Sequence, residues 1–326
     1  MSKLKLGLIG AGGMASSVHY PSFAEFEDVE MVGLCDLIEE KRRTLAERLN
    51  IKRHFADYCA MLDETQPEAV CIFMPPHHLF DIVINCLSRG LHIFIEKPPA
   101  VTTFQTEAMA RLAAEKGCIT QVGFNRRHDP LINLALQEAR RHGKITQVHA
   151  TFVKGTSAIY YNGAVDVIGC DAIHAVDIIR YMAGGEVVHV QSTIGQYDSP
   201  VPNAWNAIIA FDNGVVGVLQ SNWSVGGRMH RFEVHSIGYS AYIEQCTDIT
   251  ELIREGNRRT HRTAAEVMGE EAAGDQRRVN GFYQQARHWV DCIQAGRQPS
   301  SNFADAVLTM RLVDDIRLGY ISPPLR

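Results

Sequence analysis

The sequence predicts an α/β domain built on a doubly wound parallel sheet, followed by an α+β domain with a large, mainly antiparallel open sheet. The first 124 residues alternate short, continuous apolar runs with helical patterns, which is typical of parallel strands covered on both faces. After about residue 125, strand patterns follow one another closely. Asp212-Asn213-Gly214 between two of them is a tight-hairpin signal that favours antiparallel pairing.

The first predicted domain comprises residues 1–124 and its elements follow from these two periodicities. Gly90 and Gly117 each follow a helical pattern, as C-terminal stop signals do. We expect strands at residues 4–10, 30–36, 69–74, 92–96 and 119–124, and helices at 38–49, 80–87 and 103–116.

The second predicted domain comprises residues 125–326. Residues 254–281 are charged and poor in large apolar side chains, so we expect a surface excursion there. We expect helices at residues 130–141, 167–182, 282–295 and 303–318, and strands at 145–153, 187–195, 205–211, 215–223, 232–236 and 241–244.

Composition and charge exclude several classes of protein. A net charge of −5 gives no attraction to nucleic acid or to acidic membranes, and scattered basic pairs such as Arg126-Arg127 are typical of solvated faces. No segment approaches the roughly 18 consecutive apolar residues of a membrane helix. The eight cysteines form no CxxC pair and several lie in apolar runs, which predicts buried thiols in a reducing compartment. We therefore expect a cytoplasmic protein.

A glycine-rich turn joins the first strand to a helical stretch. Gly10, Gly12, Gly13, Met14 and Ala15 belong to the pattern GAGGMA, a GxGxxA sequence. One glycine allows the tight turn, the second lets a pyrophosphate approach the backbone, and the small third residue lets the helix pack closely. The unpaired N–H groups of the helix N-terminus then bind the phosphates, so this turn predicts a Rossmann dinucleotide site.

Asp36 ends the second predicted strand, where a carboxylate binds the adenosine ribose of a dinucleotide. A carboxylate there accepts from the ribose 2′-hydroxyl and repels a 2′-phosphate. We therefore expect NAD as the cofactor, with NADP as the alternative. Arg42 and Arg43 lie too far along the following helix to be expected as 2′-phosphate ligands.

The segment HIFIEKPPA ends a buried strand on a charged pair, Glu96 and Lys97, followed by Pro98 and Pro99. Ligands of open parallel sheets bind outside the carboxyl ends of the strands, so we expect Lys97 beside the cofactor and substrate. Successive strand residues point to opposite faces, which argues against a simple Glu96–Lys97 ion pair. The prolines restrict the backbone that carries Lys97, and a charged strand end entering a loop is the alternative interpretation.

The glycine turn, Asp36, the Glu96-Lys97-Pro98 triplet and the segment Gly123-Phe124-Asn125-Arg126-Arg127 together resemble the Gfo/Idh/MocA family of oxidoreductases. The resemblance covers essentially the whole chain. It implies binding of NAD(P), interconversion of alcohol and ketone on sugars, polyols or inositols, and Lys97 as the central catalytic lysine. It also implies that the open sheet of the second domain forms a homodimer or homotetramer.

A second signature of this family is a helical aspartate followed four residues later by a histidine. Here His174 fits, but the position four before it is Cys170, and the aspartate is Asp171. Three residues apart, Asp171 and His174 are expected on one helix face, where Asp171 orients His174 for deprotonation of a hydroxyl. A helix-start aspartate and a histidine satisfied in a domain interface are the alternative.

Further residues complete the expected site. Pro75, in a loop where the family often has Thr-Pro-Asn, and Glu96 are expected to contact the cofactor. The expected substrate contacts are Lys97, Asn125, Arg126, Tyr160, Asp171 and His174. His77 and His78 are expected only as possible contacts near the cleft.

The leading hypothesis is therefore an NAD(P)-dependent dehydrogenase that interconverts a secondary alcohol and a ketone on a sugar, inositol or related polyol. In the oxidation direction, His174, assisted by Asp171, or Lys97 would accept the hydroxyl proton. An NAD-dependent glycosidase that oxidises its substrate transiently and a non-catalytic NAD-binding regulator are the alternatives. No carboxylate–histidine spacing indicates a metal, so none is expected. The sequence does not identify the substrate.

Overall fold

The chain forms two compact units in the computed structural model, which describes residues 2–245, 249–254 and 257–321. The first unit contains the residues up to Gly123 together with Phe282–Val307. The second contains Phe124–Gly281 and the chain from Leu308 onward. The first boundary between the units thus lies between Gly123 and Phe124, one residue before the expected boundary. The return at Phe282 shows that a continuous domain over residues 125–326 was the wrong expectation.

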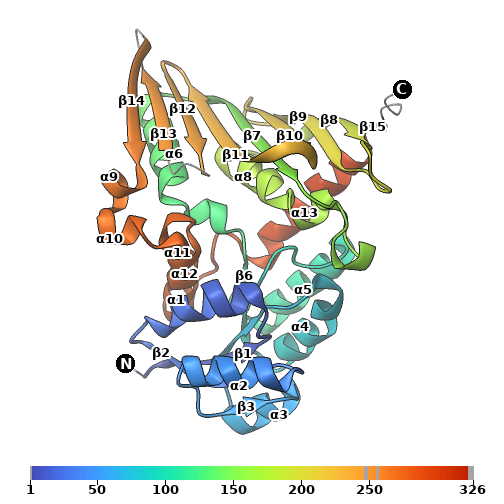
Figure 1. The fold of residues 1–326 in the computed structure, drawn as a ribbon, viewed down its shortest axis with the longest axis vertical. Coiled ribbons are helices and arrows are strands. Elements are labelled where there is room, and N and C mark those ends of the chain that lie inside the picture. The colour runs from blue at the N-terminus through green and yellow to red at the C-terminus, as the bar shows by residue number, and fades with distance from the viewer. Residues whose placement is uncertain (1, 246–248, 255–256, 322–326) are drawn as a thin grey trace. The chain divides into compact units, whose positions relative to one another are not determined.

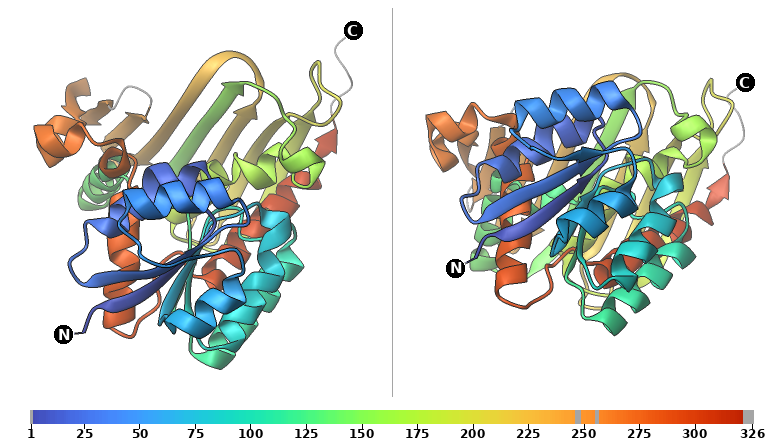
Figure 2. Two further views of the ribbon diagram at one scale, coloured as in Figure 1. Left: turned by 60° about the horizontal axis from the view of Figure 1, so that its bottom comes forward. Right: turned by 90° about the horizontal axis from the view of Figure 1, so that it is seen from below.

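The first unit is built on a six-stranded sheet with the order β3-β2-β1-β4-β5-β6 (Figure 1). All five strand pairs are parallel, and helices cover both faces (Figure 2). This is the doubly wound Rossmann arrangement. The strands are β1 (Leu4–Ile9), β2 (Val29–Cys35), β3 (His54–Phe55), β4 (Ala69–Ile72), β5 (His92–Ile95) and β6 (Thr120–Val122).

The helices of the first unit include four expected ones, one of which was expected in the second domain, and several that were not expected. A π-helical turn, η1, and the short α3 lacked a clear pattern in the sequence. The helical segments are η1 (Ala15–His19), α1 (Tyr20–Ala24), α2 (Glu39–Arg48), α3 (Tyr58–Thr65), η2 (Pro76–His78), α4 (Leu79–Ser88), α5 (Thr103–Lys116) and α12 (Phe282–Gln294). Helix α13 (Phe303–Arg317) starts in the first unit and ends in the second.

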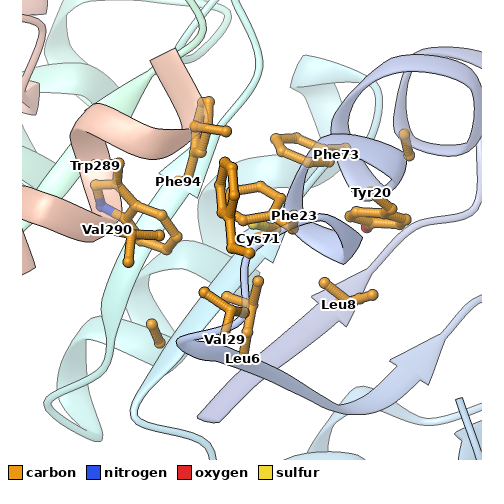
Figure 3. Close-up of a cluster of buried hydrophobic side chains, with 14 of the residues drawn as sticks. Leu6, Leu8, Tyr20, Phe23, Val29, Cys71, Phe73, Phe94, Trp289 and Val290 are labelled. Carbon is orange, nitrogen blue, oxygen red and sulfur yellow. The ribbon is translucent and has the colours of Figure 1, made fainter. Parts of the chain in front are cut away.

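The return of the chain to the first unit is explained by the core around Phe94 of β5 (Figure 3). Trp289 of α12 is fully buried, and its ring centroid lies 5.5 Å from that of Phe94 and 6.0 Å from that of Phe23. Burying a side chain of this size contributes roughly 1.5–3 kcal/mol. The apolar face of α12 therefore completes the core of the sheet that begins the chain.

The second unit contains a nine-stranded sheet with the order β14-β13-β12-β11-β7-β10-β9-β8-β15. The pairs β7–β10 and β8–β15 are parallel and the others antiparallel. The expected hairpin at Asp212-Asn213-Gly214 is confirmed, with Gly214 at φ +82°. The strands are β7 (Ile145–Gly155), β8 (Val187–Gly195), β9 (Ala204–Phe211), β10 (Val216–Asn222), β11 (Ser224–Ser236), β12 (Tyr239–Glu244), β13 (Ile249–Arg254), β14 (Arg258–Thr263) and β15 (Tyr320–Ile321).

Helices α6 and α8 pack on one face of this sheet, α6 against β11 and β12 and α8 against β7 and β10. The expected surface excursion at residues 254–281 is wrong in part, because β14 extends the sheet and three short helices follow it. Residues 255 and 256 of that segment lie outside the described residues. The helices are η3 (Asn125–His128), α6 (Pro130–His142), η4 (Tyr161–Gly163), α7 (Val167–Cys170), α8 (Ile173–Ala183), α9 (Ala264–Met268), α10 (Glu270–Ala273) and α11 (Gln276–Val279).

The described cysteines agree with the expected thiol chemistry. All seven of them are thiols, and six are buried; Cys246 lies outside the described residues. Burial raises the pKa of the Cys71 thiol well above its usual range, so it is unreactive at neutral pH. Among the described helices, none has the length and apolar character needed to cross a bilayer.

Candidate active site

The glycine-rich turn follows β1 directly. Gly10 has φ +98°, and a Cβ there would lie 2.2 Å from the carbonyl oxygen of Phe73, so only glycine fits. At Gly12 and Gly13, no described atom lies within 4 Å of the position that a Cβ would occupy. The turn therefore closes tightly on the strand side and is open above Gly12 and Gly13, where a phosphate could approach the backbone.

The helix after this turn starts at residue 13 and passes into the π-helical turn η1. Met14 is 44% exposed, whereas Ala15 is buried, as close helix packing requires. Tyr20, one turn further, is fully buried and donates its hydroxyl hydrogen to the Gly10 carbonyl at 2.7 Å. Burial raises the pKa of Tyr20 well above its usual range, so this donor persists at any working pH.

Asp36 lies directly after β2 and faces the glycine turn. Its carboxylate accepts hydrogen bonds from the backbone N–H groups of Ala11 at 2.7 Å and Ile38 at 2.8 Å. A carboxylate has about four acceptor positions, so capacity for a ribose hydroxyl remains. Arg42 was not expected to bind a 2′-phosphate, because it lies well along the following helix. Its guanidinium nevertheless donates to the carbonyls of Asp36 and Leu37 at 3.4 and 3.3 Å, so its side chain lies beside the loop that follows β2.

Glu96 and Lys97 follow β5, and the side chain of Glu96 turns towards η1. One oxygen of Glu96 lies 2.5 Å from Nε2 of the fully buried His19, and the other accepts the backbone N–H of Lys97 at 2.9 Å. A Cβ on Gly123, after β6, would lie 3.1 Å from the three carboxyl atoms of Glu96. The glycine thus makes room for Glu96. The Lys97–Pro98 peptide bond is cis.

The ring of His19 is held from several sides. It stacks on Phe73 with centroids 4.2 Å apart, and Phe94 and Phe282 approach it edge-on. Because His19 belongs to the helix that begins at the glycine turn, Glu96 links that helix to the backbone of Lys97. No sequence pattern indicated His19 as part of the site. Only the π-helical turn, a feature frequent at functional sites, marks it out.

Pro75 is half-buried and lies between β4 and η2, after the carboxyl end of a central strand. His77 and His78, in the same loop, are exposed, and their rings lie 4.0 Å apart. The loop therefore stays a candidate contact for a ligand at this edge of the sheet.

The residues of the first unit fit a bound dinucleotide. The turn at Gly12 and Gly13 leaves open backbone at a helix N-terminus, and Asp36 presents a carboxylate beside that turn. These are the groups that hold a pyrophosphate and an adenosine ribose.

In the second unit, Asp171 lies at the centre of a polar cluster. Its Oδ2 forms an ion pair with the Lys154 ammonium and accepts the Tyr160 hydroxyl at 3.0 Å. The Trp223 indole N–H donates to the Tyr160 hydroxyl at 3.0 Å. Burial, with the Asp171 carboxylate adding to its effect, raises the pKa of Tyr160 well above its usual range. Tyr160 was among the expected substrate contacts, whereas no sequence pattern indicated Trp223.

His174 lies in the first turn of α8 and, like Asp171, is 9% exposed. The single helix expected over residues 167–182 is wrong, because α7 ends at Cys170 and α8 begins at Ile173. The four-residue spacing of α-helical hydrogen bonds is interrupted there. The Ala172 N–H donates to the Val167 carbonyl, five residues earlier, and the His174 N–H donates to the Asp171 carbonyl at 3.3 Å, three residues earlier. Asp171 is therefore the C-cap of α7 and does not share a helix with His174.

Asn125 and Arg126 lie in η3, and both are buried. The Asn125 side chain donates to the Asn280 carbonyl at 2.8 Å, and Arg126 donates to the Asn280 side-chain oxygen at 3.0 Å. Arg127 forms a bidentate pair with Asp177, at 2.5 and 2.8 Å. The expectation that Arg126-Arg127 is a solvated pair was wrong, since polar partners distant in sequence allow burial.

Comparison with known proteins matches both parts of the chain. A family model described as the oxidoreductase family with an NAD-binding Rossmann fold matches residues 4–124, and the Gfo/Idh/MocA C-terminal domain matches 135–237. D-Glucoside 3-dehydrogenase of Escherichia coli K12 is 29% identical over 257 residues, covering 70% of this chain and 72% of that protein. NAD⁺-dependent scyllo-inositol 2-dehydrogenase of Bacillus subtilis is 26% identical over 304 residues, covering 87% and 84%.

Solved structures share the fold. A dehydrogenase from Chromobacterium violaceum superposes with a TM-score of 0.89 at 19% identity, covering 97% of this chain and 95% of that one. Levoglucosan dehydrogenase in complex with NADH and levoglucosan gives 0.85 at 22% identity, covering 97% and 96%. Taken with the two family models, these similarities show that the chain belongs to the Gfo/Idh/MocA family and is an NAD-binding dehydrogenase.

Proposed function

We propose that this dehydrogenase interconverts a secondary alcohol and a ketone on a sugar, inositol or related polyol. The names of the D-glucoside and scyllo-inositol dehydrogenases support this substrate class. The observation that carries the proposal is the anchoring of Lys97 after β5, where Glu96 binds its backbone N–H and the two prolines follow. In open parallel sheets, this edge is where ligands bind.

NAD supplies the hydride chemistry when it is bound. Gly12, Gly13 and Met14 would hold the pyrophosphate, with Gly10 and Ala15 shaping the turn, Asp36 binding the ribose, and Pro75 and Glu96 bordering the site. We propose NAD over NADP because Asp36 places a negative charge where a 2′-phosphate would lie. The nearby Arg42 is the feature that would favour NADP instead.

Lys97 would donate a hydrogen bond to the reacting oxygen and stabilise the charge that develops on it. His174 would accept the hydroxyl proton, because an imidazole loses and gains protons reversibly near neutral pH. The Asp171 cluster would bind neighbouring hydroxyls through Lys154 and Tyr160, since a carboxylate, an ammonium and a phenol suit a polyol. Asn125 and Arg126 would shape the pocket.

The roles of the two parts of the chain follow the same reasoning. The first unit would bind the dinucleotide, and the second unit would bind the substrate and form a homodimer or homotetramer through the large sheet. The sheet supports this, because apolar side chains such as Val188 and Ile208 are more than half exposed on it. The thiol state of the described cysteines supports a cytoplasmic location.

The test is a substrate screen of purified protein with NAD⁺ and NADP⁺ against sugars, inositols and aminopolyols, with reduced cofactor followed by absorbance. Lys97→Ala should lower kcat by about 10²–10³-fold with little change in the Kd for NADH. Lys52→Ala, an exposed lysine of the same unit, is the matched control. Near-normal turnover in Lys97→Ala would remove this lysine from the mechanism. Hydrolysis without net NADH would favour the glycosidase alternative.

A further inference from the structure

Three potential metal ligands meet on the large sheet of the second unit. His149 comes from β7, and Glu233 and His235 come from the adjacent, antiparallel β11. Glu233 is directly opposite His149, and His235 is two residues further along, so all three side chains lie on the same face of the sheet. Their ligand atoms lie within 4.8 Å of one another.

The distances within this cluster are close to those that a metal ion requires. Oε2 of Glu233 lies 3.3 Å from Nε2 of His235 and 3.7 Å from Nδ1 of His149. Zinc binds nitrogen and oxygen at about 2.0–2.1 Å in tetrahedral geometry, so neighbouring ligand atoms around it are about 3.3 Å apart. Only small rotations of the two imidazoles would be needed to bind such an ion.

Neighbouring side chains orient the candidate ligands. Ser240 of β12 lies opposite His235, and its Oγ is 2.9 Å from Nδ1 of that histidine, which directs Nε2 towards Glu233. Histidines that bind metals generally use their second nitrogen in this way. The Nε of Arg231 lies 3.0 Å from Oε1 of Glu233, which leaves Oε2 towards the histidines.

Arg231 is also the feature that opposes a cation here. Its guanidinium lies over the ring of Tyr242 at 4.9 Å and 3.9 Å from Glu244, so its charge is shared with a second carboxylate. His149 is poorly satisfied without a ligand. Its Nδ1 is too far from Glu233 for a hydrogen bond, and its buried Nε2 has no hydrogen-bond partner within the described part of the chain.

The cluster is separate from the candidate active-site residues of this unit. Phe152, on β7, is fully buried, and its ring lies 6.4 Å from that of His174. Three residues earlier on the same strand, His149 points to the opposite face. The cluster is half-buried, with the side chains of His149, Glu233 and His235 being 29%, 17% and 19% exposed. An ion can therefore reach it from solvent.

We infer that His149, Glu233 and His235 bind one divalent transition-metal ion per chain, with Zn²⁺ as the best match, and leave its fourth position to water. Two imidazoles and one carboxylate are a donor set that suits zinc. The ion would join β7 to β11 and would be structural, because its ligands face away from His174. The expectation that no metal is bound came from sequence spacing, which could not bring His149 beside β11.

The test uses the full-length protein, freed of metal with a chelator and dialysed against ZnCl₂. The wild type should retain one Zn²⁺ per chain, and His149→Gln and His235→Gln should lose it. His189→Gln, an exposed histidine on β8 of the same sheet, is the matched control and should retain the ion. Ser240→Ala should weaken binding about 10–100-fold, because it loosens the orientation of His235.

Circular dichroism of the metal-free variants should match that of the metal-free wild type, which separates loss of the site from loss of the fold. Replacing zinc with Co²⁺ provides a visible absorption spectrum that reports tetrahedral ligation. The inference is overturned if the wild type retains no ion after dialysis. It is equally overturned if His149→Gln and His235→Gln keep the same stoichiometry and affinity as His189→Gln.

Discussion

Replacing Glu96 with alanine should destabilise the first unit and misplace Lys97 at the same time. His19 is fully buried, and its Nε2 would lose the carboxylate that lies 2.5 Å away. Leaving such a group unsatisfied costs about 1–3 kcal/mol, and losing the acceptor of the Lys97 N–H adds about 0.5–1.5 kcal/mol. We therefore expect Glu96→Ala to lower the free energy of unfolding by about 2–4 kcal/mol. Glu96→Gln, which keeps the shape and one acceptor oxygen, should lose less than half of that.

The kinetic effect should appear in kcat. A displacement of about 1 Å of a catalytic group can cost up to about 10²-fold, so we expect kcat of Glu96→Ala to fall about 10–100-fold. The Kd for NADH should change by less than about threefold, because the glycine turn and Asp36 are unaltered. Urea unfolding and steady-state kinetics measure the two effects, with Glu40→Ala on exposed α2 as the control. A free energy of unfolding of Glu96→Ala within about 0.5 kcal/mol of the wild-type value, together with an unchanged kcat, would refute the reasoning.

Three further predictions concern the first unit. Tyr20→Phe removes the buried hydroxyl that binds the Gly10 carbonyl, so we expect a loss of about 1 kcal/mol in unfolding and severalfold weaker NADH binding, checked by urea unfolding and calorimetry. Asp36→Ala should weaken NADH binding about 10–100-fold and reverse the preference towards NADPH; an unchanged NADH/NADPH ratio would contradict Asp36 as the ribose ligand. The hydrogen bond from Arg287, opposed by partial burial, lowers the pKa of Asp28 to about 2, below its unfolded value of about 3.9. The stabilisation of the folded state by the ionised Asp28 is thus complete above about pH 5 and is lost as the pH falls through the folded pKa. Since Asp28 is 40% exposed, Asp28→Asn should cost at most about 1 kcal/mol near pH 6, with a difference in urea midpoints that narrows towards pH 3.

The parts of the fold that the sequence predicted are those with a strong local signal. Continuous apolar runs located β1, β2, β4, β5 and β6 to within about two residues, and Gly184, at φ +68°, ends α8 where expected. The Asp212-Asn213-Gly214 turn fixed one antiparallel pair. In each case, the side chains themselves determine the backbone conformation, so no knowledge of distant contacts was needed.

The parts that it did not predict depend on distant partners. Strand β14 reads RRTHRT, without an apolar face, and is a strand because its backbone pairs with β13. The burial of Arg127 could not be predicted from its neighbours in the sequence, because its partner Asp177 lies 50 residues further along the chain. Likewise, α12 is recognisable as an amphipathic helix, but nothing local indicates that Trp289 packs in the core of the first sheet.

At the end of β5, strand geometry gives Glu96 and Lys97 different roles. The side chains of successive strand residues point to opposite faces of the sheet. The Glu96 side chain passes beside Gly123 and contacts His19, and the Lys97 side chain is expected to start on the opposite face. The same carboxylate also binds the Lys97 N–H, which ties the backbone of the proposed catalytic lysine to the helix that starts at the glycine turn. If that turn binds the pyrophosphate, as we propose, one buried contact connects the helix at the cofactor site to the backbone of the lysine. Glu96 would then be a positioning residue for Lys97, and the sequence alone could not show this because His19 is 77 residues away.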